Sequence, residues 1–517
     1  MHRRTFIKSG LRATTVGLGA TLLTQRADAM SSLVHPNETP SPGRMNHLFF
    51  IVDDLNVALG CYGHPAAHTP NIDRLAARGT RFANTYCPYP LCGPSRTALL
   101  TGQRPESFPM PDNEVAWRDL APDLRTLPQI FREAGYRTAG FGKIFHHGIQ
   151  ARDLAAWKAA HPDAHLPHDY EDASSWDESA GTGMPWEIER HAQGPEQIID
   201  GRAHGGTSLH SIRATHPEIL PDFITADHAI GFLRNQREWA GGQKTNPGDQ
   251  GFFLGVGFHK PHVPFIAPEK WWAFHDGLDV DSLRPPTWVQ PAELPKGTRK
   301  DERFHRGMDE EQRQHCYKGY LSCVSWMDEQ VGRVLAQLEA SGLADTTLVS
   351  FVADHGYHIG QQAQWDKMQL LDPALRDPLV LAGPGIVAGQ VATATVQSLD
   401  LFPTLLDLHG LSPGQPSQGY SLQTCLTDPD TPSARPAFGW VHAGPRQGWT
   451  LRTDRHRYGL TSWQGETPEP YLFDYQADPD ETTNLLANGT PTALQPLVAE
   501  LDAQLRAHYE SSKAPVA

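Results

Sequence analysis

Residues 92–103 read Cys-Gly-Pro-Ser-Arg-Thr-Ala-Leu-Leu-Thr-Gly-Gln and combine a nucleophilic cysteine with an arginine four residues later. Pro94 and the apolar stretch that closes with Thr-Gly predict a helix that begins near Cys92. The first N–H groups of a helix have no partner within it, and its dipole is positive at this end, so an anion is favoured there. The stretch therefore predicts a nucleophile where a small oxyanion could bind.

Two pairs of residues could hold a metal ion. Asp53 and Asp54 directly follow the apolar run 48–52, and Asp354 and His355 directly follow the apolar run 348–353. Adjacent carboxylates repel each other unless a cation or protons intervene, and hard oxygen ligands favour Ca²⁺ or Mg²⁺ over zinc. An isolated Asp pair would equally fit a helix cap or a solvated turn. The second pair favours a metal site.

Basic and imidazole side chains occur at comparable positions. Lys143 and His146 follow a short apolar strand, His262 follows the apolar run 252–258, and Lys367 follows the Asp354 segment. A Lys-x-x-His pair taken alone is more typical of an exposed surface. His259 is equally compatible with packing and with a place in a site.

The elements that must position these residues can be inferred from the apolar pattern. The runs 48–52, 252–258 and 348–353 have the length and composition of fully buried strands. In open α/β sheets the site lies at the carboxyl ends of the strands, so three strands that end in such groups predict one shared site.

The remaining pattern predicts a two-part α/β protein. Apolar residues spaced by three and four predict a helix over 320–338, with shorter helices over 70–78 and 126–134. Alternation of strands and helices over about 400 residues predicts a doubly wound α/β core. The Pro/Gly/Ser-rich stretch 412–418 predicts a boundary, so we expect a catalytic domain over 30–425 and a smaller α+β subdomain over 426–517. The aperiodic segment 150–220 is expected to be a long insertion.

Residues 1–29 resemble a bacterial twin-arginine signal peptide, with Arg3-Arg4, a weakly apolar segment and Ala27-Asp28-Ala29 before the expected cleavage point. A basic disordered tail is the alternative. No later stretch approaches the ~18 apolar residues of a membrane span. The net charge of −15 excludes long-range attraction of nucleic acid. We therefore expect a periplasmic or secreted protein without a membrane span or a nucleic-acid partner.

The stretch that begins at Cys92 closely resembles C-x-P-S-R-x-x-x-L-T-G, the modification signature of type I sulfatases. The resemblance implies an alkaline-phosphatase-like core with a large, mixed, mostly parallel sheet between helices. It implies that a formylglycine-generating enzyme oxidises Cys92 to formylglycine. It also implies a divalent ion, Ca²⁺ or alternatively Mg²⁺, held by five residues: Asp53, Asp54, Cys92, Asp354 and His355.

The same resemblance implies roles for the basic residues. Arg96, Lys143 and His146 would stabilise or deprotonate the formylglycine hydrate, and Lys143, His262 and Lys367 would bind the sulfate group. His262 or Lys367 would protonate the departing oxygen. The sequence departs from the family pattern at Gly93 and Gln103, and at Gln361-Gln362, where the family commonly has Glu-His.

Segments 60–63, 142–146 and 257–264 resemble the iduronate-2-sulfatase branch most. This resemblance implies a sulfated carbohydrate substrate, specifically a sulfated uronate or another sugar of a polysaccharide. Two alternatives remain: a phosphonate or phosphate ester hydrolase on the same scaffold, and a non-catalytic protein that binds sulfated glycan.

Overall fold

The structure is a computed structural model of the chain, and residues Arg44–Ala517 form one compact unit. The residues that it describes are 44–108, 110, 112–113, 116–146, 171–172, 174–180, 196–198, 210–242, 250–283, 294–298, 307–443 and 446–512.

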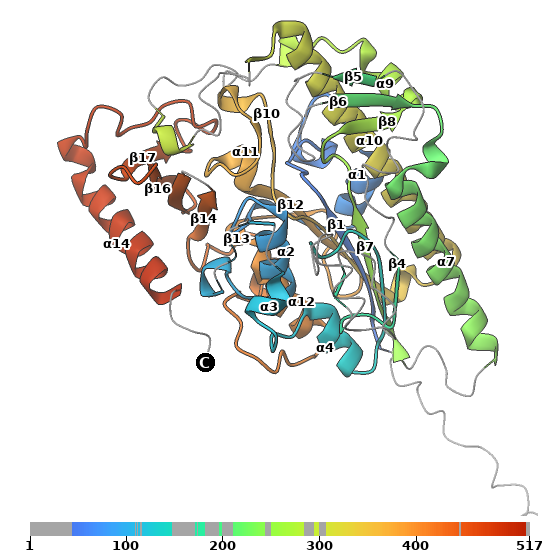
Figure 1. Ribbon diagram of the computed structural model, residues 1–517. Helices are drawn as coiled ribbons and strands as arrows, with labels where there is room; N and C mark the ends of the chain where they lie inside the picture. Colours follow the sequence, from blue (N-terminus) through green and yellow to red (C-terminus); the bar gives the residue numbers. More distant parts are fainter. Residues whose placement is uncertain are drawn as a thin grey trace, which may run out of the picture. The chain divides into compact units, whose positions relative to one another are not determined.

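A central sheet of eight strands dominates this unit, in the order β13-β2-β12-β9-β1-β7-β3-β4. Only β12 runs antiparallel to its neighbours β2 and β9, and the other described neighbours are parallel. The sheet is therefore mixed and mostly parallel, which confirms the predicted fold class (Figure 1). Its strands are β1 (Asn46–Val52), β2 (Gly79–Tyr86), β3 (Arg137–Gly142), β4 (Glu178–Ala180), β7 (Phe252–Phe258), β9 (Thr347–Ala353), β12 (Arg376–Ala382) and β13 (Gln390–Gln397).

The three strands with buried apolar runs lie side by side in the middle of this sheet. Strand β1 pairs in parallel with β7 on one side and β9 on the other, and every residue of the three strands is buried. Val52 is in register with both Phe258 and Ala353. The residues that follow these three positions must emerge together at the carboxyl edge of the sheet.

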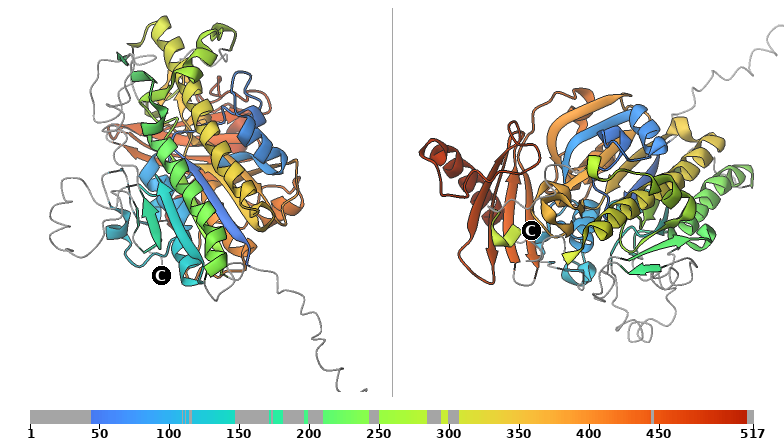
Figure 2. Two further views of the ribbon diagram at one scale, coloured as in Figure 1. Left: turned by 90° about the vertical axis from the view of Figure 1, so that its right-hand side faces the viewer. Right: turned by 90° about the horizontal axis from the view of Figure 1, so that it is seen from above.

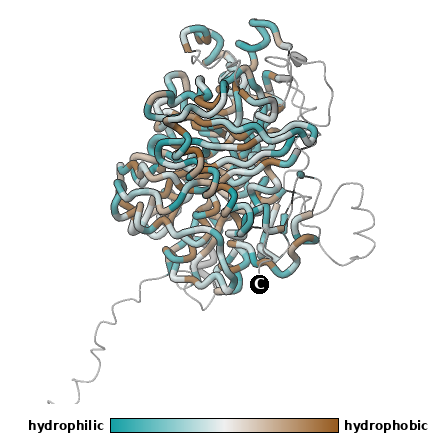
Figure 3. The backbone as a smooth tube through the Cα atoms, turned by 90° about the vertical axis from the view of Figure 1, so that its left-hand side faces the viewer, coloured by the Kyte–Doolittle hydropathy of each residue, from teal (hydrophilic) through white to brown (hydrophobic). Residues whose placement is uncertain are grey.

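Helices cover both faces of the sheet. Alternate side chains of a strand point to opposite faces, so the apolar strands present side chains on both faces that helices bury. Phe49 and Ile51 pack with α2 (Cys92–Thr101), α4 (Leu127–Glu133) and α12 (Leu401–Leu408). Leu48, Phe50 and Val52 pack with α1 (Pro70–Ala77), α7 (Pro221–Gly242) and α10 (Glu310–Ala340). Figure 2 shows α7 and α10 side by side, and in Figure 3 the most hydrophobic stretches run through the middle of the molecule.

Helix α10 begins ten residues before the predicted start at 320. Asp309 and Gln312 form a reciprocal capping box at its N-terminus. The first turns, Glu-Glu-Gln-Arg-Gln-His, are polar, so apolar periodicity could not detect them. The predicted helices over 70–78 and 126–134 correspond to α1 and α4.

The C-terminal region contains an antiparallel sheet in the order β14-β15-β16-β17, covered by helix α14. The bounds are β14 (Ala437–Ala443), β15 (Arg446–Arg452), β16 (His456–Trp463), β17 (Glu469–Asp474) and α14 (Gln495–Ser512). This is the expected α+β composition, and the domain boundary at 425 stays a prediction. The sheet packs against the core through a buried cluster that includes Tyr89, Leu370 and Trp440.

Shorter elements complete the described chain. Two small sheets are formed by β5 (Glu196–Ile198), β6 (His210–Ala214) and β8 (Phe265–Pro268), and by β10 (His358–Ile359) and β11 (Trp365–Asp366). The short helices are α3 (Trp117–Leu120), α9 (Glu269–Asp276), α11 (Asp372–Leu375) and α13 (Gln423–Thr427).

Several sequence predictions concern residues outside the described ranges. The signal-like segment 1–29 and most of the expected insertion at 150–220 belong to this group. Among the helices that could be searched, none is both long and apolar enough to cross a lipid bilayer.

Candidate active site

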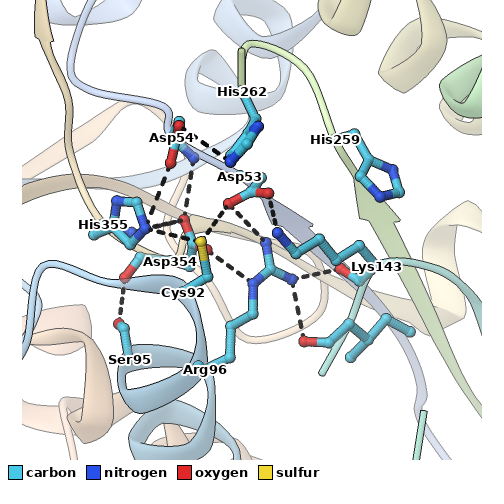
Figure 4. Close-up of polar contacts among 12 residues, drawn as sticks. Asp53, Asp54, Cys92, Ser95, Arg96, Lys143, His259, His262, Asp354 and His355 are labelled. Atoms are coloured by element: carbon cyan, nitrogen blue, oxygen red, sulfur yellow. Dashed lines mark hydrogen bonds and ion pairs between the residues drawn. The ribbon is translucent and has the colours of Figure 1, made fainter. Parts of the chain in front are cut away.

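Cys92 is the first residue of α2 and is fully buried at the carboxyl edge of the sheet. Its Sγ lies 3.2 Å from Asp53 Oδ1, 3.4 Å from His355 Nε2 and 3.2 Å from Lys367 Nζ. Helix α2 ends at Gly102, whose φ of 68° is the left-handed conformation that glycine adopts without strain. The Cys92 stretch is thus a complete short helix with its cysteine aimed into a polar cluster (Figure 4).

Three buried carboxylates surround this thiol. Asp53 and Asp54 follow β1, Asp354 follows β9, and Asp354 Oδ1 accepts a hydrogen bond from Asp54 N at 3.2 Å. The possible ligand atoms of two overlapping groups lie within 4.8 Å of one another: Asp53, Asp54, Cys92 and His262, and Asp53, Cys92, Asp354 and His355. The geometry brings all five residues of the expected metal set together and adds His262.

The electrostatics of these carboxylates fit a divalent cation. Burial, together with the charges of Asp53 and Asp354, raises the pKa of Asp54 to about 6 despite the opposing effect of Lys367. Within the described part of the chain, Asp54 Oδ2 is buried and accepts no hydrogen bond. A hard cation would satisfy this oxygen and relieve the repulsion between carboxylates.

Arg96 joins two sides of the site from one turn inside α2. Its Nε donates to Asp354 Oδ2 at 2.8 Å, and its Nη2 lies 3.8 Å from Asp53 Oδ1. Its Nη1 donates to the carbonyl oxygens of Lys143 and Ile144. The guanidinium is fully buried, so it fixes the helix, the carboxylates at the sheet edge and the loop after β3 relative to one another.

Two lysines bring further positive charge to the carboxylates. Lys143 Nζ donates to Asp53 Oδ2, and Lys367 Nζ donates to Asp54 Oδ1 at 2.5 Å. Burial acts to lower the pKa of Lys367, but Asp54 and the groups at Cys92 and Asp53 hold it well above the usual value. Burial acts to raise the pKa of Asp53, but the positive charges of Lys143, Arg96 and Lys367 hold it well below the usual value.

The histidines differ in charge. Burial acts to lower the pKa of His355, but Asp354 and Cys92 raise it to about 10. Burial and the ammonium of Lys367 hold the pKa of His262 well below its usual value, so His262 is neutral at neutral pH. His262 Nε2 lies 3.7 Å from Asp54 Oδ2, and a quarter of its side chain is exposed. His146 ends the described loop after β3 and is partly buried, and its role stays a prediction.

Sequence reasoning missed Glu171. Its Oε1 accepts hydrogen bonds from the backbone N–H groups of Ile144 at 2.9 Å and Phe145 at 3.3 Å, and its Oε2 accepts one from Trp176 Nε1 at 2.8 Å. Burial raises the pKa of Glu171 to about 7. Glu171 therefore holds the backbone between Lys143 and His146. It lies in the aperiodic segment, where no spacing or motif could identify it.

Two other residues acquire a place from the structure. Ser95, a position of the motif with no role assigned from sequence, donates its hydroxyl proton to the carbonyl oxygen of Asp354. His259 stands beside the cluster in Figure 4, and its Nδ1 lies 3.8 Å from Asp222 Oδ1. Ser95 thus connects α2 to the residue after β9, and His259, which follows β7, lies beside the cluster.

The architecture and this cluster agree with the sequence comparisons. The Sulfatase family profile matches residues 45–411, and a profile described as N-sulphoglucosamine sulphohydrolase, C-terminal, matches residues 360–511. The chain belongs to the sulfatase family and is a sulfuric ester hydrolase. Membership in this enzyme family favours a hydrolase over the alternative of a non-catalytic protein that binds sulfated glycan.

Individual relatives extend the comparison. Iduronate 2-sulfatase of Mus musculus is 31% identical over 509 residues, which cover 83% of this chain and 87% of that protein. Phosphonate monoester hydrolase from Silicibacter pomeroyi superimposes with a TM-score of 0.68 at 24% identity, over 91% of this chain and 96% of that one. A structure in complex with its substrate D-glucosamine-2-N,6-O-disulfate gives a TM-score of 0.68 at 22% identity, over 91% and 98% of the two chains. These two structures share the fold of this chain.

Proposed function

We propose that this sulfatase removes sulfate from a sulfated uronate or another sugar of a polysaccharide. The observation that carries the chemistry is the position of Cys92, buried at a helix start between the Asp53 carboxylate and the Lys367 ammonium. The substrate class rests on the likeness to iduronate 2-sulfatase over 83% of the chain.

The proposed nucleophile is made from Cys92. A formylglycine-generating enzyme oxidises this residue to formylglycine. One hydroxyl of its hydrate gives its proton to the neighbouring Asp53 carboxylate and bonds to sulfur as the ester S–O bond breaks. Asp53, Asp54, Asp354, His355 and residue 92 would hold Ca²⁺, with Mg²⁺ as the alternative, and the ion would offset the negative charge of the sulfate oxygens.

The remaining residues act on charge and on protons. Arg96 and Lys143 keep the Asp53 side of the site rigid and positive, because both contact that carboxylate. Lys367 is protonated and His262 is neutral before substrate arrives. Either Lys367 gives its proton to the departing sugar oxygen, or His262 does so after the bound sulfate anion offsets the Lys367 ammonium and the imidazole takes up a proton. His146 then takes the proton of the second hydroxyl. The aldehyde C=O re-forms as the bond between the carbon and the sulfate oxygen breaks, and sulfate leaves.

A phosphonate or phosphate ester hydrolase is the second candidate, because the same cations would neutralise a phosphoryl group. The fold shared with phosphonate monoester hydrolase is the observation that favours it. Parallel assays of 4-nitrophenyl sulfate and of a phenylphosphonate monoester, on the enzyme matured with a formylglycine-generating enzyme, separate the two. We expect the sulfate ester to have the higher kcat/KM, and a higher value for the phosphonate would replace the proposal.

A desulfation screen tests the substrate class. Defined disaccharides with sulfate at O2 of a uronate, O6 of a hexosamine or N2 of a glucosamine are incubated with the enzyme, and released sulfate is measured. We expect the uronate 2-O-sulfate to be preferred. Preference for a hexosamine sulfate would keep the sulfatase chemistry and reject the iduronate-like specificity.

Export is proposed through the twin-arginine-type segment 1–29. This route transports folded proteins, so Cys92 would be oxidised in the cytoplasm before export. Intact-mass measurement of periplasmic protein tests both steps: we expect a chain without residues 1–29 that carries the aldehyde. Periplasmic protein with an unmodified thiol would reject early oxidation, and absence from the periplasm and medium would reject export.

A further inference from the structure

We propose that the C-terminal sheet positions Lys367, with Arg446 and Tyr471 as the residues that hold it in place. The inference rests on the proposed role of Lys367 in sulfate binding or proton transfer. It assigns a function in the reaction to a region that contributes no residue to the metal cluster.

The backbone around Lys367 is strained. Gln362, Ala363, Asp366 and Met368 have φ values of 50°, 54°, 106° and 70°. Side chains other than glycine rarely adopt such values, and they persist only where the surroundings hold them. Four of the seven positive-φ positions other than glycine in the described chain fall in this short segment. The segment therefore needs external contacts to keep Lys367 in place.

Those contacts come from the C-terminal region. Arg446 Nη1 donates to the carbonyl oxygen of Met368 at 2.8 Å, and the Tyr471 hydroxyl donates to the carbonyl oxygen of Leu370 at 3.0 Å. Hydrogen bonds also join the two ends of the segment to residues 480–481: Gln362 Nε2 donates to Asp480 O at 3.0 Å, and Asp372 N donates to Glu481 Oε2 at 2.8 Å. The Lys367 segment is thus tied at four points to residues 446–481.

The Arg446 contact is buried and specific. Arg446 is 4% exposed, and its charge faces Asp366. Asp366 Oδ1 in turn accepts a hydrogen bond from Lys367 N at 2.8 Å. A buried charged donor on a carbonyl is worth more than a neutral one, and its loss leaves the acceptor without a partner. Arg446 is therefore linked to the Lys367 segment by its hydrogen bond to Met368 O, and its charge is attracted to the Asp366 carboxylate that accepts from Lys367 N.

Packing reinforces these hydrogen bonds. Leu370 belongs to the buried cluster with Tyr89, Leu91 and Trp440, between the core and the C-terminal sheet. A Cβ atom at Gly448 of β15 would lie 2.8 Å from Leu370 Cδ1, so a side chain there would have to displace the end of the leucine. The sheet and the segment are therefore in close contact at this point.

Two pairs of variants test the inference. Arg446→Met and Tyr471→Phe remove the hydrogen bonds to the segment, and Arg446→Lys retains a charged donor. The matched controls come from the same region: Arg455→Met, in the turn between β15 and β16, removes a surface ion pair with Asp474, and Tyr458→Phe in β16 removes a hydrogen bond to Asp502. Misplacement of a group by about 1 Å can cost about 10²-fold, so we expect kcat to fall by about 10- to 100-fold in Arg446→Met and less in Tyr471→Phe. Arg446→Lys should recover part of the loss, and both controls should stay within about twofold.

A second readout does not depend on activity. Lys367 is 5% exposed and Lys143 is 6% exposed, so both should react slowly with acetic anhydride in the folded enzyme. Peptide mass spectrometry measures the acetylation rate at each lysine. We expect Arg446→Met and Tyr471→Phe to accelerate the acetylation of Lys367 several-fold and to leave that of Lys143 unchanged. Equal acceleration at both lysines, or none at Lys367 in either variant, would overturn the inference.

A double variant separates this inference from the proposed role of Lys367. If Arg446 acts through Lys367, adding Arg446→Met to Lys367→Met should change the residual kcat by less than about twofold. Multiplied losses would show that Arg446 acts independently and would reject the inference. If Lys367→Met alone keeps full kcat, the proposed role of Lys367 fails, and the acetylation rates still decide whether the sheet positions this side chain.

Discussion

At the residue scale, the site balances buried charges of opposite sign. Asp53, Asp54 and Asp354 are fully buried, and the cationic groups of Arg96, Lys143 and Lys367 contact them. Removing one member of such a buried set leaves its partner's charge uncompensated, which costs several kcal/mol.

The proton donor can be identified through the leaving group. Loss of a general acid slows a reaction by about 10²- to 10⁴-fold when the leaving group is a poor one, such as a sugar hydroxyl, and far less for a nitrophenol. We expect this contrast in kcat for whichever of Lys367→Met and His262→Asn removes the donor. The comparison uses 4-nitrophenyl sulfate and a sulfated sugar. A uniform loss on both substrates would instead assign the residue to sulfate binding.

Glu171 predicts a pH dependence of stability. Its pKa is raised to about 7 in the folded protein from 4.5 in the unfolded chain, so the folded state binds the proton more tightly. The stabilising contribution of this group is complete below about pH 4.5, falls as the pH rises and is lost above about pH 7. Relative to Glu171→Gln, the unfolding free energy should therefore decrease by about 3 kcal/mol across this window. Denaturant titrations at several pH values measure it, and a pH-independent difference would contradict the assignment.

Some site residues could be predicted from a pattern in the sequence, and others could not. Asp53, Cys92 and Asp354 could be predicted to meet, since each follows a buried strand or begins a helix at the same sheet edge. Glu171 could not, because a lone carboxylate in an aperiodic segment has no spacing that distinguishes it from a solvated one. The orientation of Lys367 also required the structure, because it depends on backbone with positive φ at residues other than glycine.

At the element scale, strand register delivers the site. The common alignment of Val52 with Phe258 and Ala353 brings residues 53, 259 and 354 to one level. The buried apolar runs made these strands predictable. The short strands β10 and β11 were not, because two residues carry no periodicity.

The contact between α1 and α10 predicts a local stability effect. Asp328 of α10 accepts hydrogen bonds from the first free N–H groups of α1, at Asn71 and Ile72, where Thr69 provides no side-chain cap. We expect Asp328→Ala to lower the unfolding free energy by about 2 kcal/mol, because one buried and one part-buried backbone donor lose their acceptor. The control Glu339→Ala removes a surface pair with Arg78 between the same helices and should cost less than about 1 kcal/mol. Thermal denaturation measures both, and equal costs would show that Asp328 does not cap α1.

At the scale of the whole molecule, the candidate active site depends on two regions of one compact unit. The core supplies the carboxylates, which follow β1 and β9, and the thiol, at the start of α2. The C-terminal sheet contacts the segment that carries Lys367. The presence of a smaller C-terminal α+β region was predictable from composition and short apolar segments. Its contacts with the Lys367 segment were not, because they join positions about 80 residues or more apart along the chain.

Metal removal should act on the whole molecule. The candidate ligands come from β1, α2 and β9, so an ion bound there links three central elements. A ligand that binds only the folded state stabilises it by about 3–4 kcal/mol at 100 to 1,000 times its Kd. We expect chelation to lower Tm by several degrees and Ca²⁺ to restore it, while Asp54→Asn should weaken that restoration. A Tm that changes neither with chelator nor with added Ca²⁺ would contradict the metal site.

Residue 92 is the proposed nucleophile, and this role is tested by the turnover of a sulfate ester by Cys92→Ala, produced together with a formylglycine-generating enzyme and compared with the unsubstituted chain. We predict a loss of at least about 10³-fold in kcat, with Tm changed by no more than a few degrees. Full turnover by the folded Cys92→Ala variant would contradict the account.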